Sequence, residues 1–182
     1  MPNVLLIVEL KEYHLTMKSN PTLSRRAFAG LFAALALAVG ASVPAFAHEA
    51  PCPLCKVTLT QDTATQDNET VLRLGRKRIE YKCVYCAMTE ANTRYKSSDV
   101  TILAPSEKKG APVEITRKGG TWNAPDGAVF IAVKASHRVC QETYRAFTSK
   151  AGYDAYVAKN KAKLADAKPL TLAEMVAVAD AK

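Results

Sequence analysis

Residues 77–95 read KRIEYKCVYCAMTEANTRY and join a strand pattern, a cysteine pair and a helix pattern. The side chains of residues 77–82 alternate between polar and apolar, which predicts a β-strand. From residue 83 to residue 95 the apolar side chains recur at helical spacing, which predicts a helix. The pair Cys83 and Cys86 falls in the first turn of that helix. Free backbone N–H groups and the positive end of the helix dipole favour thiolates there.

A second Cys-x-x-Cys pair precedes this segment and reads Cys52-Pro53-Leu54-Cys55. A proline inside the loop and β-prone residues at 56–59 are typical of a metal-binding knuckle. Residues 69–74 and the turn residue Gly75 then supply the first half of a hairpin. Knuckle, hairpin and helix-start pair form a treble-clef arrangement. Four sulfurs can then converge on one tetrahedral ion, with Zn–S bonds of about 2.3 Å.

The rest of the chain is predicted to follow the same order of elements. We expect strands at 99–104, 112–117, 127–133 and 168–172, and helices at 141–159 and 173–179. Hairpins outnumber βαβ crossovers, so we predict the α+β class. The expected organisation is two small strand–strand–helix–strand halves, residues 48–104 and residues 111–182, of which the first is treble-clef-like.

Residues 1–47 have the pattern of an export signal. Ser24-Arg25-Arg26 resembles the twin-arginine motif, and Ala45-Phe46-Ala47 is a small-x-small cleavage site after an Ala/Leu-rich run. Cleavage there leaves 135 of the 182 residues. The net charge falls from +8 to +6, because the segment holds four basic and two acidic residues. We predict a periplasmic protein, exported by the twin-arginine route or alternatively by Sec, with no stable membrane span after cleavage.

The two cysteine pairs leave other chemistries open. Thiols in an oxidising compartment tend to form disulfides, so two disulfides are one alternative. A thioredoxin-like redox pair and iron–sulfur ligation are others. Covalent haem attachment needs a histidine after the second cysteine, and Lys56 and Ala87 stand there instead. The chain has five cysteines, and an odd number leaves at least one thiol unpaired in a monomer.

The fifth cysteine, Cys140, lies three residues after His137. Both side chains can reach one ion from a loop or from the start of a helix. Thiolate and imidazole, with the thioether of Met88 nearby, describe a soft site suited to Cu(I). The alternative is that Cys140 and Met88 are buried apolar side chains.

Several functions are excluded by what the chain lacks. Only His48 and His137 remain after cleavage, and no set of nucleophile, base and orienting group is present. We therefore predict that the chain is not an enzyme, with thiol–disulfide exchange left open. Basic residues at 73–78 surround one turn and form no binding face, and export makes nucleic acid a poor partner.

The mature chain resembles the NosL family, the copper-binding accessory proteins of nitrous oxide reductase assembly. The motifs that carry the resemblance are Cys52-Pro-Leu-Cys55, Ile79-Glu80-Tyr81-Lys82-Cys83, Ala128-Val129-Phe130-Ile131, Tyr144-Arg145-Ala146-Phe147 and Pro169-Leu170-Thr171-Leu172-Ala173-Glu174-Met175. The resemblance implies two small halves and Cu(I) binding at a soft site.

The chain also departs from that family. The usual Cys-Gly-Met is replaced here by Cys55-Lys56-Val57. Cys140 stands where the family tends to have a methionine, and no cysteine at the cleavage point offers a lipid anchor.

The first functional hypothesis is an exported soft-metal accessory protein that binds or delivers Cu(I) to a client metalloprotein. The metal-ligand candidates are Cys52, Cys55, Cys83, Cys86, His137 and Cys140. The second hypothesis is a structural Cys₄ zinc module that binds a partner, and the third is a thiol–disulfide protein.

Overall fold

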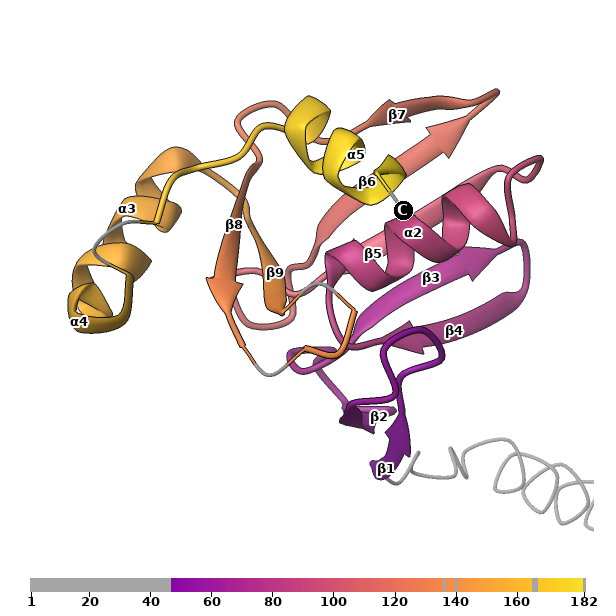
Figure 1. The fold of residues 1–182 in the computed structure, drawn as a ribbon, viewed down its shortest axis with the longest axis horizontal. Coiled ribbons are helices and arrows are strands. Elements are labelled where there is room, and N and C mark those ends of the chain that lie inside the picture. The colour runs from indigo at the N-terminus through magenta and orange to yellow at the C-terminus, as the bar shows by residue number, and fades with distance from the viewer. Residues whose placement is uncertain (1–46, 136, 140, 165–166, 182) are drawn as a thin grey trace, which may run out of the picture. The chain divides into compact units, whose positions relative to one another are not determined.

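The hairpin around Gly75 forms the edge of the largest sheet (Figure 1). In this computed structural model β3 (Thr70–Leu74) pairs with β4 (Lys77–Tyr81), and Gly75 takes the first turn position with φ +55°. Glycine adopts this left-handed conformation at no steric cost. The structure describes residues 47–135, 137–139, 141–164 and 167–181. The predicted export segment up to residue 46 and Cys140 lie outside these residues.

Three further strands complete an antiparallel sheet in the order β4-β3-β5-β6-β7. They are β5 (Val100–Ala104), β6 (Val113–Lys118) and β7 (Thr121–Asn123). Leu72, Ile102 and Ile115 lie opposite one another on adjacent strands and are fully buried. They form one apolar face, because alternate side chains of a strand point to the same side. The sheet takes strands from both of the predicted halves.

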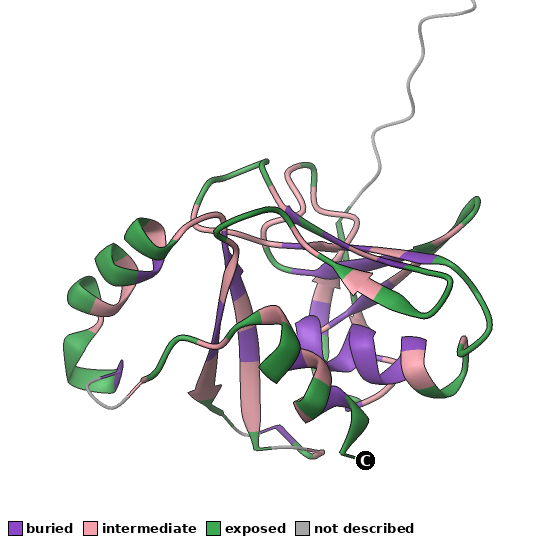
Figure 2. Ribbon diagram, turned by 90° about the horizontal axis from the view of Figure 1, so that it is seen from above, coloured by how far each residue is buried: buried purple, intermediate pink, exposed green. Residues whose placement is uncertain are grey.

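Helix α2 (Val84–Thr93) lies against this face. It contacts β3, β4 and β5, and also β9 (Glu142–Phe147) and α5 (Leu172–Asp180). All of its residues from Val84 to Ala91 are buried, as Figure 2 shows by colour. A helix that is covered on more than one side must be apolar around most of its circumference. The predicted helix at 83–95 is therefore confirmed, and its burial fixes the position of Cys86.

The C-terminal end of α2 is held by a buried arginine of the sheet. The Arg117 guanidinium donates hydrogen bonds to the carbonyl oxygens of Ala91 (3.0 Å), Tyr95 (2.6 Å) and Ser98 (3.0 Å), and to Asn92 Oδ1 (2.9 Å). The last carbonyls of a helix have no partner within the helix. Arg117 supplies a partner for Ala91 and joins α2 and the turn after it to β6.

The N-terminal hairpin consists of β1 (His48–Pro51) and β2 (Thr58–Gln61). Residues 52–57, called here the knuckle loop, connect these strands and carry the first cysteine pair. Arg78 of β4 anchors the end of the hairpin by ion pairs with Asp62 (3.1 Å) and Glu80 (2.5 Å). The backbone N–H of Asp62 also donates to the Glu80 carboxylate (3.0 Å). The hairpin is therefore tied to the main sheet.

The remaining elements follow β7. A further hairpin is formed by β8 (Val129–Lys134) and β9 (Glu142–Phe147). It is followed by α3 (Lys150–Lys159), α4 (Lys161–Leu164) and α5 (Leu172–Asp180). The capping box of Thr171 and Glu174 begins α5. Mixed helices and antiparallel strands confirm the α+β class.

The helix predicted at 141–159 is wrong in its first third, because Glu142–Phe147 is a strand. Tyr144 and Ala146 are buried, whereas Thr143 and Arg145, which precede them, are partly exposed. This is an alternation of period two. Pairing with β8 satisfies the backbone of this segment, and that pairing is invisible to local sequence spacing. The predicted strand at 168–172 is reduced to a single bridge between Leu170 and Phe130.

The chain divides into two units, residues 1–43 and residues 44–182, and the elements above all belong to the second. Within the part of the chain that the structure describes, none of the helices has the length and apolar character needed to cross a membrane.

Candidate metal centre

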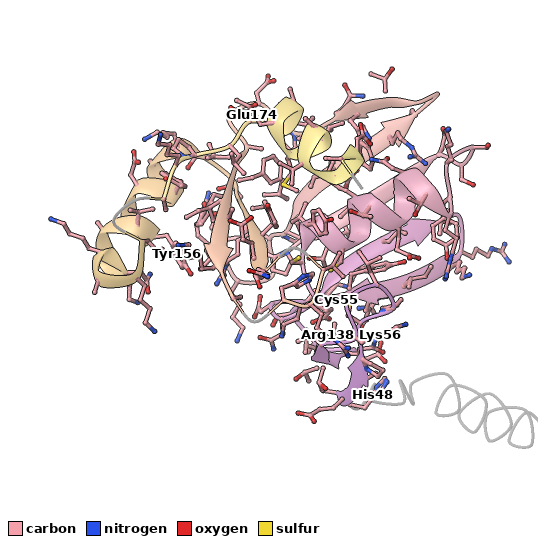
Figure 3. The ribbon with its side chains drawn as sticks, in the orientation of Figure 1. His48, Cys55, Lys56, Arg138, Tyr156 and Glu174 are labelled. Atoms are coloured by element: carbon pink, nitrogen blue, oxygen red, sulfur yellow. The ribbon has the colours of Figure 1, made fainter. Side chains whose placement is uncertain are left out.

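The knuckle loop and the start of α2 meet in the protein interior. The backbone N–H of Lys82 donates a hydrogen bond to Cys52 Sγ at 3.4 Å, across thirty residues of sequence. Figure 3 shows Cys55 and Lys56 between the β1–β2 hairpin and α2. The four cysteines of the two pairs are free thiols and are at most 2% exposed. The structure thus brings both predicted pairs together.

The backbone of the knuckle loop folds tightly around its own cysteines. Cys52 N–H donates to Val57 O (2.9 Å), and Lys56 N–H donates back to Cys52 O (3.0 Å). Lys56 has φ +62°, a left-handed conformation that favours glycine, and its Nζ donates to Pro53 O (2.7 Å).

The second pair lies at the N-terminus of α2, as predicted. Cys83 is the N-cap residue, with extended backbone, and Cys86 is the third residue of the helix. Their Sγ atoms are 3.7 Å apart. The first backbone N–H groups of a helix are unpaired within the helix and carry partial positive charge. These groups stabilise a negative charge at the start of the helix.

His137 joins the same cluster from the loop between β8 and β9. Its ring is 3% exposed, and Nε2 lies 3.1 Å from Cys86 Sγ. Backbone hydrogen bonds fix the loop: His137 N–H donates to Ala135 O (2.7 Å), and Gln141 N–H donates to His137 O (2.8 Å). The sequence associated His137 with Cys140, whereas the structure places it against Cys86. Cys140 itself is outside the described residues.

Five side chains therefore form the cysteine–histidine cluster: Cys52, Cys55, Cys83, Cys86 and His137. Their donor atoms fall into two triads, and within each triad all three atoms lie within 4.8 Å of one another. The first triad is Cys52, Cys55 and Cys86, and the second is Cys83, Cys86 and His137. Cys86 belongs to both.

The pKa values of the cluster thiols are displaced in opposite directions. A hydrogen bond from the Cys86 thiol lowers the pKa of Cys52 to about 5 against the opposing effect of burial. The same thiol lowers the pKa of Cys83 well below its ordinary value. Cys86 holds the shared proton, so its own pKa is raised by the hydrogen bonds to Cys52 and Cys83. Burial raises the pKa of Cys55 to about 11.

An aromatic wall that sequence reasoning did not assign lies beside the cluster. Tyr85 of α2 stacks on Tyr144 of β9 at 5.5 Å between ring centroids, and Tyr85 also meets His137 edge-on at 6.2 Å. Both tyrosines are buried beside His137. In the sequence, the only indication of these aromatic contacts was that Tyr85 lies between Cys83 and Cys86.

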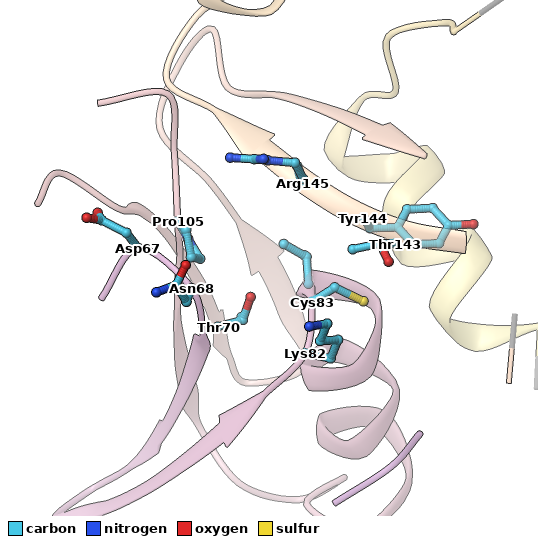
Figure 4. A pocket seen from close by; sticks show the side chains of 10 residues that line it. Asp67, Asn68, Thr70, Lys82, Cys83, Pro105, Thr143, Tyr144 and Arg145 are labelled. Atoms are coloured by element: carbon cyan, nitrogen blue, oxygen red, sulfur yellow. The ribbon is translucent and has the colours of Figure 1, made fainter. Parts of the chain in front are cut away.

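A pocket of about 210 Å³ lies against the cluster at Cys83 (Figure 4). Lys82 and Cys83 line it from the start of α2, Thr143 and Arg145 from β9, and Asp67 from the loop before β3. This is smaller than the ~300–1,000 Å³ that is usual for drug-sized ligands. Of the five cluster residues, only Cys83 lines this pocket.

The fold and the cluster define an α+β protein with a buried set of soft donor atoms. No family model matches the chain, and no curated protein matches it. Among solved structures, the chain is similar to the mercury-bound form of MerB2, with a TM-score of 0.52 and 15% identity over 87% of this chain and 74% of that one. At this identity the similarity shows the fold alone. Membership of the NosL family remains a prediction.

Proposed function

We propose that this chain is an exported accessory protein that binds one or more soft metal ions, with Cu(I) as its physiological cargo. The observation that carries the proposal is the buried cysteine–histidine cluster, which offers four sulfurs and one imidazole nitrogen. Thiolate and imidazole donors select soft and borderline ions over Mg²⁺ or Ca²⁺, which take oxygen ligands. A hard cation does not fit this donor set.

Copper is favoured over other soft ions by the number of donors in each triad. Each triad offers three donors, and Cu(I) accepts two or three ligands, which also allows it to leave by stepwise ligand exchange. The resemblance to NosL supports the same metal. The MerB2 structure of similar fold holds mercury, another thiophilic ion. The cargo would be passed to a client metalloprotein.

A structural zinc site is the second candidate. In a treble-clef zinc site, one cysteine pair lies in a tight loop and the other lies at the start of a helix. The knuckle loop and the start of α2 present the two pairs in this way. In that case the metal would hold the fold together, and the function would be partner binding.

Metal analysis of the protein isolated from the periplasm, together with a count of free thiols, separates these functions. We expect copper that a Cu(I) chelator removes without unfolding the chain. One tightly held zinc with four protected thiols would establish the structural module instead. Two disulfides and no metal would contradict both and favour a thiol–disulfide protein.

Export is tested in the same cells. Replacing Arg25 and Arg26 by lysine should leave the full-length chain in the cytoplasm if the twin-arginine route is used. Periplasmic recovery of this variant at the wild-type level would indicate Sec export.

A further inference from the structure

The two triads of the cluster share one sulfur. Cys86 Sγ lies 3.1 Å from His137 Nε2 and 3.7 Å from Cys83 Sγ, and it also belongs to the group formed with Cys52 and Cys55. Cys86 comes from the buried first turn of α2, so it is held between the knuckle loop and the β8–β9 loop. A thiolate sulfur has lone pairs enough to bind two metal ions.

The distances between the donor atoms do not match a single tetrahedral ion. With metal–sulfur bonds of about 2.3 Å, four sulfurs around one ion lie about 3.8 Å from one another. Within the described residues, no four donors of the cluster lie mutually within 4.8 Å. The donors form two three-membered sets instead, and around a three-coordinate ion with ~2.3 Å bonds the sulfurs would lie about 4.0 Å apart. Each triad has the size for one ion.

We propose that the centre holds two soft metal ions bridged by the Cys86 thiolate. The first ion binds the first triad, and the second ion binds the second triad. This inference rests on the proposed function and adds the number of ions and the role of each ligand. When the site fills, each protonated thiol that binds a metal ion releases its proton, whereas a thiolate binds without releasing one. Cys86 releases one proton and then binds the second ion through another lone pair.

Charge favours the second ion. When all four cysteines are thiolates, one bound Cu(I) leaves the buried centre with a net charge of −3. A second Cu(I) changes this net charge to −2. Burying uncompensated charge is costly, so the second monovalent ion stabilises the filled centre. The cysteines that carry this charge are at most 2% exposed.

The two ions differ in their ligands. The first is bound by sulfur alone, from the knuckle loop and α2. The second has the imidazole of His137, which comes from a loop, and Cys83, which lines the pocket of Figure 4. The second ion is therefore the one nearer to a path to solvent, and we expect it to exchange first.

The test is an anaerobic Cu(I) titration of the full mature chain, with bound copper counted by native mass spectrometry and metal analysis. All measurements use a Cys140→Ser background, so that the fifth thiol cannot supply a ligand. We expect two Cu(I) per chain. His137→Ala should bind one, Cys52→Ser should bind one, and Cys86→Ser should lose tight binding of both. X-ray absorption should show copper–copper scattering in the two-ion form.

His48→Ala is the matched control. His48 is the other histidine of the mature chain, and its side chain is 54% exposed and pairs with Asp62 outside the cluster. This variant should still bind two ions. Circular dichroism of each metal-free variant identifies any variant that fails to fold. The copper–copper scattering of the Cys140→Ser protein tests the bridge while all five cluster residues are intact.

Two results would overturn the inference in different ways. One Cu(I) per chain, lost equally in all three cluster variants, would show a single-ion site and leave the proposed function standing. Absence of Cu(I) binding in the folded background protein would contradict the proposed function and this inference together.

Discussion

Cys86 is the residue on which the cluster is centred. It is fully buried, and its thiol proton is shared with the sulfurs of Cys52 and Cys83. A metal ion that binds these sulfurs must displace this proton. Metal binding at such a site is a competition between the ion and the proton.

This competition predicts the pH dependence of metal binding. At pH 7 Cys52, with a pKa of about 5, is a thiolate, whereas Cys55, with a pKa of about 11, and Cys86 hold protons. Loading the four cysteines should release about two protons, and the affinity should rise steeply with pH. Below pH 5 Cys52 is also protonated, so the affinity should fall faster there. Calorimetry in buffers of different ionisation enthalpy measures the number of protons released. Release of no protons at pH 7 would contradict the assignment.

Cys83 should be the most reactive cysteine of the cluster. A pocket reaches it, and hydrogen bonds from Cys86 lower its pKa and favour the nucleophilic thiolate. In the metal-free protein, iodoacetamide should label Cys83 before the other three cluster cysteines, and loading with copper should protect it. Peptide mass spectrometry after short exposure gives the order. Equal or faster labelling of Cys55, whose pKa is raised, would show that the loop opens instead.

Three elements carry the donors, and each is fixed by a different kind of interaction. Backbone hydrogen bonds shape the knuckle loop, packing on both sides holds α2, and two backbone bonds hold the loop at His137. Of these, α2 matters most, because it carries the bridging sulfur. Its C-terminal end depends on Arg117.

Arg117→Lys should destabilise the protein and loosen the centre. The ammonium has three donors on one atom and cannot reach the four acceptors that the guanidinium serves, so carbonyls at the end of α2 and in the turn after it lose partners. We expect a loss of about 2 kcal/mol in the free energy of unfolding. Urea unfolding of the metal-free protein measures it.

Arg73→Lys provides the comparison, because Arg73 is an exposed residue of the same sheet. Its effect should stay within about 0.5 kcal/mol. If the two lysine variants unfold at the same urea concentration, Arg117 does not hold the helix in the way described.

At the scale of the whole molecule, the cluster joins parts of the chain that are far apart in sequence. The first pair, the second pair and His137 span residues 52–137, and they come from the N-terminal hairpin, α2 and the β8–β9 loop. A bound ion closes these segments on one another. The metal should therefore stabilise the fold as well as occupy the site.

Removing the metal should lower the stability of the whole second unit. Binding to the folded chain alone stabilises it by about 4 kcal/mol when the free ion is ~1,000 times its dissociation constant. Anaerobic urea unfolding of copper-loaded and metal-free protein measures this difference. A Cys52→Ser/Cys83→Ser double variant, which loses one ligand from each triad, should show little shift on adding copper. Equal midpoints for the wild-type protein with and without copper would mean that the ion does not bridge the segments.

Local patterns in the sequence predicted the elements nearest to the cysteines. The hairpin at Gly75, the helix from residue 84 and the tight knuckle loop follow from turn residues, periodicity and proline position, which are local properties. The segment 142–147 was mistaken for helix because its strand is set by pairing with β8. That pairing depends on a separate strand, β8, which precedes the segment in the chain.

By itself, the sequence determined the chemistry of this protein: two cysteine pairs, the turn that presents one and the helix start that presents the other. Only the tertiary structure decided how these donors are grouped, because the distances between them depend on packing between distant segments. His137 lies 51 residues from Cys86, and no periodicity connects them. Their contact follows from α2 being buried between the main sheet and the β8–β9 hairpin, which makes Cys86 the sulfur shared by two triads.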